Sequence, residues 1–457
     1  MEKYSILLPI VFPVLMGGVL PLLPLKSKRA RNLYVELVTI ATSVFAVWLI
    51  FHRPSEDFVV LNLAGELAVM FHIDGLGMVF GWLISFLWPF ATLYAFEYME
   101  HDGKDNAFFA FYTMTFGVTI GIAFSGNLMT MYMFYEMLTL VTMPLVMHGT
   151  SRKAILAGQK YMIYSIGGAA FAFIGFIFVY RLGNTMNFTF GGVFDGVFLG
   201  NKEAFVKGVY VLAVLGFGVK AAIFPLHGWL PAVSIAPTPV TALLHAVAVV
   251  KAGAFAIIRI TYYSFGTELL RGSFAQYIVL GFAIATILFG SARAVKEPHL
   301  KRRLAYSTIS NLSYIVFAAL LMTPAGMVGS LMHMVAHAFI KITLFYCAGA
   351  ILHRSGLEYV RDMKGIGRKM PYVCVCFLVA GLGLVGIPPM AAFVSKWHIG
   401  TAAVALGEPI AIFGCFAVLI SAFCTAVYIF SFLMHAFFPQ EQEINERVLR
   451  AGDPTWR

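Results

Sequence analysis

Residues 211–259 read VLAVLGFGVKAAIFPLHGWLPAVSIAPTPVTALLHAVAVVKAGAFAIIR and contain two apolar runs, each with a lysine near its middle, Lys220 and Lys251. A lysine inside a membrane-length apolar run costs roughly 2.5 to 3.5 kcal/mol or more, so such residues usually line an ion or proton path. Prolines interrupt the segment between the two runs, first at Pro225 and Pro231. Because a broken helix at membrane depth must face protein or water, this stretch predicts a buried, hydrated charge pathway.

The composition of the whole chain indicates a polytopic membrane protein. Of 457 residues, 60% are hydrophobic and 12% are charged, far from the balance of a soluble globular domain. About 20 apolar residues span a bilayer. On that criterion we expect an all-α fold with about 13 spans, near 5–25, 32–51, 73–96, 107–125, 128–147, 161–180, 208–226, 239–260, 275–292, 304–322, 326–352, 372–399 and 410–437.

The basic residues between these spans predict the topology. With the N-terminus outside, the inward connections carry 21 Lys and Arg residues and the outward ones carry six. Basic residues concentrate on the cytoplasmic side. We therefore expect an inner (plasma) membrane protein with its C-terminus in the cytoplasm. We attribute the net charge of +10 to the basic residues that set this orientation, and not to nucleic-acid binding.

Four lysines fall inside spans, and these are Lys220, Lys251, Lys341 and Lys396. Arg259 also lies in a span, near its outer end, where we expect the long side chain to reach the interface. Glu136 is the one acid placed well inside a span. A buried charge needs a partner, so Glu136 is expected to pair with one of the lysines.

Histidines extend this series. His245 lies six residues before Lys251, while His333, His337 and Lys341 recur at four-residue spacing and so share one helix face. Two histidines at this spacing could bind zinc, but the HExxH glutamate is missing and Lys341 would oppose a cation. Imidazole titrates near neutral pH, so a row of side chains that passes protons along fits better than a zinc site. The alternatives left open are hydrogen bonding between helices and static ion pairs that fix helix register.

A second interrupted span carries Pro388-Pro389 in mid-run, with Lys396 beyond it. The interrupted spans are the seventh and the twelfth, each the fourth in a block of five. Interrupted segments at matching positions of two halves point to transporter sites, and an odd block length gives the halves opposite topology. We therefore expect two inverted five-helix repeats, at 107–260 and 275–437. They follow three spans and a short external hairpin in 1–106 and precede a polar cytoplasmic tail at 438–457.

Five long motifs carry a family resemblance, and these are FYEMLTLVTMPL, the stretch from Val219 to Arg259, HLKRRLAYSTISNLSYI, HMVAHAFIKITLFYCAGAIL and GIPPMAAFVSK. They resemble the antiporter-like membrane subunits shared by respiratory complex I, Mrp cation/proton antiporters and membrane-bound hydrogenases. The resemblance covers roughly residues 70 to 437. Members usually have fourteen spans, whereas here a polar segment follows the thirteenth.

The resemblance implies roles for single residues. Glu136 is similar to the glutamate of the family's fifth helix and Lys220 to its partner lysine in the seventh. Lys251 with His245 matches the eighth-helix connection. The remaining matches are the eleventh-helix group, His333, His337 and Lys341, and the terminal ionisable group of the second half-channel, Lys396.

We therefore hypothesise a proton-translocating or cation/proton-translocating subunit of a larger redox-driven or Mrp-type complex, in which Lys220 passes protons toward Lys251 and the histidines while Lys396 controls exit. Its partners would be the lipid bilayer, other antiporter-like and small membrane subunits and, as a further candidate, a redox peripheral arm, with protons and Na⁺ as candidate cargo. The alternatives are a self-sufficient Na⁺/H⁺ antiporter and a quinone-binding oxidoreductase subunit.

The sequence has no nucleotide fingerprint and no cysteine spacing typical of zinc or iron–sulfur ligands. We thus expect no metal and no cofactor, and no covalent chemistry by this chain.

Overall fold

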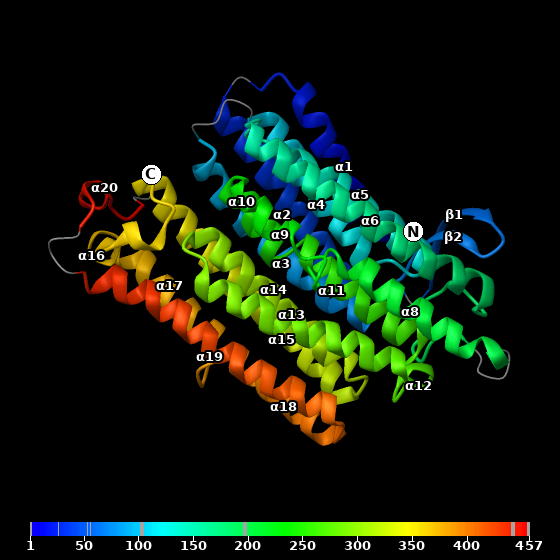
Figure 1. Cartoon of the computed structure of the whole chain (residues 1–457). Coiled ribbons are helices and arrows are strands. Elements are labelled where there is room, and N and C mark those ends of the chain that lie inside the picture. The colour runs from blue at the N-terminus through cyan, green and yellow to red at the C-terminus, as the bar shows by residue number, and fades with distance from the viewer. Residues whose placement is uncertain are drawn as a thin grey trace. The chain divides into compact units, whose positions relative to one another are not determined.

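The computed structural model describes residues 2–25, 27–52, 54, 56–100, 105–194, 199–439 and 444–454. Within these ranges the chain is built from helices, apart from one two-stranded hairpin. It divides into two compact units, of which the first comprises Met1–Ala221 with Ile235–Val279 and the second Ala222–Ser234 with Leu280–Arg457. The all-α membrane fold expected from composition is thus confirmed (Figure 1).

The first unit holds the helices up to the start of α13, except α9 and most of η4. Its long helices are α1 (Leu8–Val19), α2 (Lys28–His52), α3 (Gly75–Tyr98), α4 (Asp105–Ala123), α5 (Leu128–Val146), α6 (Arg152–Leu182), α8 (Glu203–Gly218) and α11 (Val249–Arg259). Its shorter helices are η1 (Glu2–Leu7), η2 (Leu20–Leu22), η3 (Gly200–Lys202), α10 (Thr238–Ala246), the π-helix η5 (Ile260–Phe265) and α12 (Thr267–Leu270).

The second unit holds the rest, with α13 (Phe274–Lys296) beginning in the first unit and ending in the second. Its long helices are α14 (Leu300–Leu320), α15 (Pro324–Ser355), α17 (Pro371–Val385), α18 (Ala391–Leu406) and α19 (Pro409–Phe437). Its shorter helices are α9 (Trp229–Ala232), η4 (Val233–Ile235, whose last residue belongs to the first unit), η6 (Val360–Met363), α16 (Ile366–Lys369) and α20 (Glu446–Arg450).

The predicted count of about 13 spans is not confirmed. In the described part of the chain, ten helical stretches are long and apolar enough to cross a bilayer by themselves. Three predicted spans fall short for physical reasons: α8 has only 16 residues, α14 carries charged and hydroxyl residues along its length, and 372–399 is divided into α17 and α18.

Two interruptions lie near prolines. Helix α8 ends at Gly218, Pro225 lies in the turns that follow, and Pro231 is inside the short α9. Helix α17 ends at Val385, where Gly386 adopts a φ of +85°, and Pro388-Pro389 separates it from α18. Proline lacks the backbone N–H that a continuing helix needs, and its ring clashes with the preceding turn, so the helix cannot continue through Pro388-Pro389.

A third interruption has no proline. The sequence predicts one continuous span at 239–260, but α10 ends at Ala246 and α11 begins at Val249. Between them Val247 (φ −125°, ψ −56°) and Ala248 (φ −86°, ψ −84°) leave the α-helical region. Valine and alanine allow helix, so local sequence contains no signal for this break. The break places His245 in the last turn of one helix and Lys251 in the first turn of the next.

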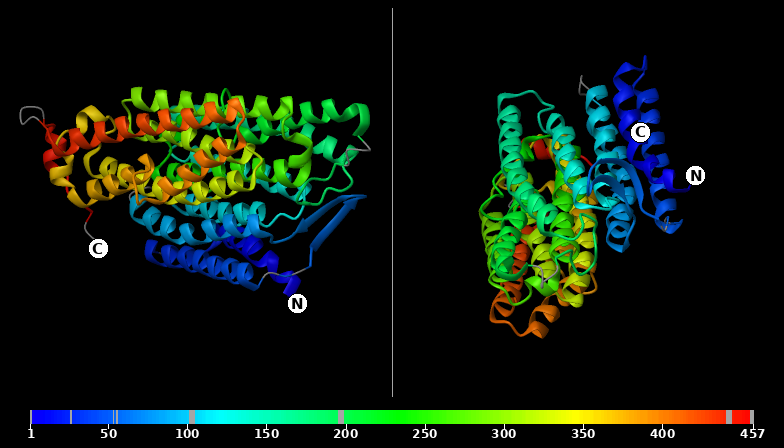
Figure 2. Two further views of the ribbon diagram at one scale, coloured as in Figure 1. Left: turned by 90° about the horizontal axis from the view of Figure 1, so that it is seen from below. Right: turned by 90° about the vertical axis from the view of Figure 1, so that its right-hand side faces the viewer.

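The hairpin fills the polar gap between α2 and α3. Strands β1 (Phe58–Ala64) and β2 (Leu67–Phe71) pair antiparallel, with Phe58 opposite Phe71. Figure 2 shows them as a paired ribbon extending from the ends of the neighbouring helices of this unit. The start of α5 holds the hairpin, since Asn127 Nδ2 donates to the Ala68 carbonyl at 2.7 Å and Thr130 Oγ1 accepts from Met70 N at 2.8 Å.

A buried ion pair joins α3 to α11. The Arg259 guanidinium donates to both oxygens of Asp74, at 2.5 Å and 2.6 Å, and Asp74 also caps α3 by accepting from Gly77 N. The side chain of Arg259 is only 1% exposed, and the rings of Phe188, Phe255 and Tyr263 surround it. The expectation that Arg259 reaches the interface is therefore wrong, because Asp74 supplies a bidentate partner inside the protein.

Neutralising Asp74 should destabilise the chain. In Asp74→Asn the amide keeps the helix cap but leaves the guanidinium buried without a counter-charge, which typically costs about 3–5 kcal/mol. We expect a clear fall in the apparent unfolding temperature of the full chain in nanodiscs. The control is Glu203→Gln, which removes the charge paired with Lys207 on a half-exposed helix face and should cost less than about 1 kcal/mol. An Asp74→Asn variant as stable as the control would show that the Asp74–Arg259 ion pair does not contribute to the stability of the fold.

Candidate functional site

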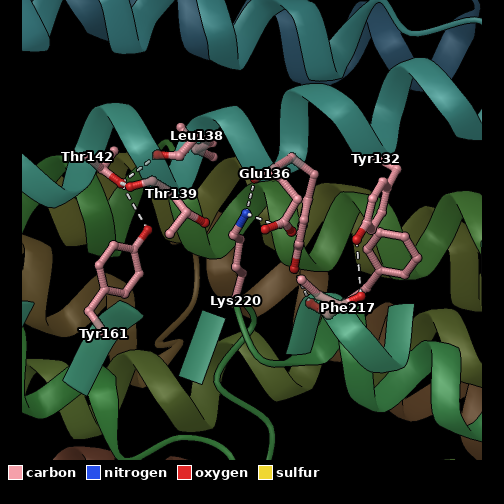
Figure 3. Close-up of polar contacts among 10 residues, drawn as sticks. Tyr132, Glu136, Leu138, Thr139, Thr142, Tyr161, Phe217 and Lys220 are labelled. Atoms are coloured by element: carbon pink, nitrogen blue, oxygen red, sulfur yellow. Dashed lines mark hydrogen bonds and ion pairs between the residues drawn. The ribbon is translucent and has the colours of Figure 1, made fainter. Parts of the chain in front are cut away.

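The first unit brings Lys220 and Glu136 together. Lys220 lies directly after the end of α8, and Glu136 lies in the middle of α5. Their charged groups, Nζ and Oε1, are 3.9 Å apart, and Figure 3 shows the two side chains pointing toward each other. Lys220 is 1% exposed and Glu136 is 28% exposed.

The ammonium of Lys220 is hydrogen-bonded to backbone, not to the carboxylate. Its Nζ donates to the Tyr135 carbonyl and lies 3.5 Å from the centre of the Tyr135 ring, where the π-face attracts a cation. The Tyr135 hydroxyl in turn donates to the Phe217 carbonyl at 2.6 Å. At 3.9 Å, Lys220 and Glu136 attract each other by charge alone, with about 4 kcal/mol at an effective dielectric constant near 20. The pair can therefore separate without breaking a hydrogen bond.

Lys251 lies in the first turn of α11, and His245 lies in the last turn of α10. Both side chains are fully buried. Gly253, two residues beyond Lys251, packs so tightly on the turn after α8 that a Cβ would lie 2.3 Å from Ala221 N and 2.7 Å from the Lys220 carbonyl carbon. This close approach of α11 to the backbone of Lys220 brings the two predicted lysines of the first unit into one region.

The second unit holds the remaining predicted residues. On α15, His333, His337 and Lys341 are all fully buried. The imidazole of His333 contacts Ser395 Oγ at 2.8 Å, and its ring centre is 6.0 Å from that of His337. Lys341 Nζ donates to the Leu304 carbonyl at 3.0 Å and to the Ser307 hydroxyl.

Lys396 caps the broken end of α17. Its Nζ donates to the carbonyls of Leu384 and Val385, at 2.7 Å and 2.9 Å. These are among the carbonyls that a helix C-terminus leaves without an intrahelical donor, at the end where the helix dipole favours a cation. The interruption at Pro388-Pro389 thus creates the acceptors that Lys396 uses.

The segments that hold the lysines of the second unit contain no acid. The sequence has no Asp or Glu from 298 to 357 or from 363 to 407, the segments that contain Lys341 and Lys396. Carbonyl and hydroxyl oxygens accept hydrogen bonds from these two lysines. In the first unit, by contrast, the carboxylate of Glu136 lies beside Lys220. Among the described residues, no group of three or more His, Cys, Asp or Glu side chains gathers as metal ligands would.

Sequence reasoning missed the hydroxyl residues around these lysines. Ser307 and Tyr314 lie on α14, and Ser421, Thr425 and Tyr428 lie on α19, and all five are at most 1% exposed. They recur at spacings of seven, or of four and three, and so follow one face of each helix. Hydroxyl residues at helical spacing within apolar spans were the sequence signal that could have revealed this set.

Replacing Gly253 should disturb the first unit at Lys220. In Gly253→Ala the added Cβ meets backbone atoms that cannot rotate away, so α11 or the turn after α8 must move. We expect a lower apparent unfolding temperature and slower proton transport in proteoliposomes. Gly208→Ala on α8 is the matched control, because a Cβ there meets nothing within 4 Å and alanine favours helix by roughly 1 kcal/mol. Equal behaviour of the two variants would refute the close packing.

Comparison with known proteins identifies the family. Residues 125–424 match the model of the NADH:quinone oxidoreductase/Mrp antiporter transmembrane family. The chain is 32% identical to NADH-quinone oxidoreductase subunit N of Desulforudis audaxviator over 82% of its own length and 74% of that protein. It is 30% identical to a Na⁺/H⁺ antiporter protein of Alkalihalophilus pseudofirmus over 80% of its length, but spans only 47% of that relative.

Solved structures agree on the fold. The chain superposes on a chain of the archaeal membrane-bound sulfane sulfur reductase with a TM-score of 0.84 and 22% identity, covering 97% of this chain and 90% of that one. It also superposes on a chain of the Mrp complex from Dietzia sp. with a TM-score of 0.82 and 21% identity, covering 99% and 84%. The family match over residues 125–424 confirms the resemblance carried by the five motifs: this chain is a multi-pass membrane protein of the NADH:quinone oxidoreductase/Mrp antiporter family.

Proposed function

We propose that this chain translocates protons, or exchanges protons for another monovalent cation, as one antiporter-like membrane subunit of a larger complex. The observation that carries the proposal is the Lys220–Glu136 pair, a buried ammonium 3.9 Å from a carboxylate and hydrogen-bonded elsewhere. Ionisable residues inside a membrane are expensive and mark proton relays. A static structural pair would instead be expected to hydrogen-bond directly, because poor geometry fails to repay desolvation.

The pair can act as a switch. Each charge stabilises the other, so separating Glu136 from Lys220 favours release of the lysine proton and bringing it back favours uptake. Because the two groups share no hydrogen bond, the motion that separates them breaks only their Coulomb attraction. Lys251, held near Lys220 through Gly253, is the proposed acceptor within the first unit.

The second unit is proposed to carry protons among its own groups. Lys341 with His337 and His333 forms one row on α15, and Lys396 at the broken end of α17 is the terminal group. With no acid in these spans, the charged lysines depend on carbonyl and hydroxyl oxygens. A proton on Lys396 therefore stabilises the broken end of α17, where the helix dipole favours a cation. Its loss removes that positive charge and leaves the neutral amine with two of its three N–H donors.

Relatives suggest the setting of this activity. The matched proteins are named as subunits of an NADH-quinone oxidoreductase and of a Na⁺/H⁺ antiporter, and the matched structures as a respiratory membrane complex and an Mrp complex. We propose membrane partner subunits here too, and a plasma-membrane location with the N-terminus outside, supported by the 21 inward against six outward basic residues. A pH gradient generated by this chain alone in an antiporter-deficient host would instead indicate a self-sufficient antiporter.

Removing the ammonium of Lys220 should abolish transport. We expect Lys220→Ala in the assembled complex to give no proton movement in proteoliposomes, measured with a pH-sensitive dye, while the complex still purifies intact. Lys220→Arg keeps the charge but does not release its proton, so it should be inactive as well. The exposed Lys202 offers the control Lys202→Ala, which should pump normally. Normal pumping by Lys220→Arg would show that titration of this residue is not required.

A further inference from the structure

Beyond the histidine row, the second unit contains a series of neighbouring buried hydroxyl groups that begins at Lys341. The ammonium of Lys341 donates to the Ser307 hydroxyl, and Ser307 is hydrogen-bonded to the Tyr428 side chain. The Tyr428 hydroxyl donates to Thr425 Oγ1 at 3.2 Å. Thus three hydroxyl groups from α14 and α19 follow directly on the lysine.

The same set ends beside Lys396. Ser421 lies one helical turn before Thr425 on α19, and the Thr425 hydroxyl donates to its carbonyl at 2.8 Å. The Tyr314 hydroxyl donates to Ser421 Oγ at 2.5 Å. The centre of the Tyr314 ring is 5.4 Å from Lys396 Nζ and 5.3 Å from the His333 ring.

We propose that these five hydroxyl residues, Ser307, Tyr428, Thr425, Ser421 and Tyr314, form a second proton route from Lys341 to Lys396, parallel to the route over His337 and His333. The two routes converge at Tyr314, whose ring lies beside both His333 and the Lys396 ammonium. This inference rests on the proposed function, since it assigns residues to proton movement in the second unit.

Hydroxyl groups are suited to this task because each has one donor hydrogen and two acceptor lone pairs. A proton given by Lys341 to the Ser307 oxygen is matched by release of the Ser307 proton to Tyr428, so no charge stays on a hydroxyl. Three hydroxyls must turn first. Ser307 now donates to the Leu304 carbonyl, and Thr425 donates to the Ser421 carbonyl. The Tyr314 hydroxyl donates to Ser421 and must point its hydrogen elsewhere before it can accept. All five side chains are at most 1% exposed, so the route runs inside the protein.

The competing explanation is that the hydroxyls only join helices, as buried polar groups do in membranes. That explanation predicts lower stability when a hydroxyl is removed, and an effect on transport that is the same whether or not the histidine route is intact. Parallel routes predict the opposite: either route alone carries protons, and loss of both stops them.

Thr425→Val tests the route, because valine keeps the shape of threonine and removes only the hydroxyl. His337→Gln blocks the histidine route with a side chain that does not titrate. Proton transport by the assembled complex in proteoliposomes is measured for each variant and for the double variant. We expect each single variant to retain much of the wild-type rate, and the double variant to fall roughly tenfold or more below the product of the two single effects.

Thr343→Val is the matched control, since the Thr343 hydroxyl donates within α15, to the Phe339 carbonyl. Combined with His337→Gln it should add no further loss. The apparent unfolding temperature of Thr425→Val checks that a slower rate is not a loss of folded protein. Losses in the double variant that merely multiply, or that equal those of His337→Gln alone, would overturn the parallel route.

Failure of this inference and failure of the proposed function have different signatures. If Lys220→Ala pumps normally, the proposed function falls whatever the hydroxyl variants do. If Lys220→Ala is inactive but the Thr425→Val and His337→Gln effects multiply, protons pass through the second unit without the hydroxyl route.

Discussion

A lysine ammonium inside a membrane must find its acceptors within the protein, and this requirement explains most of the arrangement around the four intramembrane lysines. An ammonium has three donors and no acceptor, and leaving it unpaired in an apolar interior costs far more than a normal hydrogen bond contributes. Lys220, Lys341 and Lys396 each donate to at least one backbone carbonyl. The carbonyls at the end of α17 are available only because the helix stops there.

The two units meet this requirement differently. In the first, Glu136 adds a counter-charge at 3.9 Å from Lys220, so the state of the lysine depends on where a carboxylate lies. In the second, neutral oxygens accept from Lys341 and Lys396, so the lysines depend on helix ends and hydroxyl groups. With a charged partner, the stability of the lysine's charged form changes when the partner moves. A backbone carbonyl accepts a hydrogen bond from the ammonium but does not take its proton.

The Asp74–Arg259 pair shows that a buried charge can also be structural. Arg259 donates to both carboxylate oxygens and is enclosed by three aromatic rings, whereas Lys220 shares no hydrogen bond with Glu136. The first geometry fixes the end of α11, eight residues beyond Lys251. The second geometry leaves room for separation. Hydrogen-bond geometry, more than burial, distinguishes a charge that anchors from a charge that can act.

The sequence by itself determined the membrane class, the family, the four intramembrane lysines and the interruption at Pro388-Pro389, because hydropathy, charge and proline chemistry are properties of single residues and short segments. Tertiary structure decided the partners. Asp74 and Arg259 are 185 residues apart in sequence, and the break at Val247 and Ala248 has no local cause. The Tyr428 hydroxyl of α19 meets Ser307, which accepts from Lys341, only after α14 and α19 have packed. Such contacts depend on which helix faces pack together, and no short stretch of sequence contains that information.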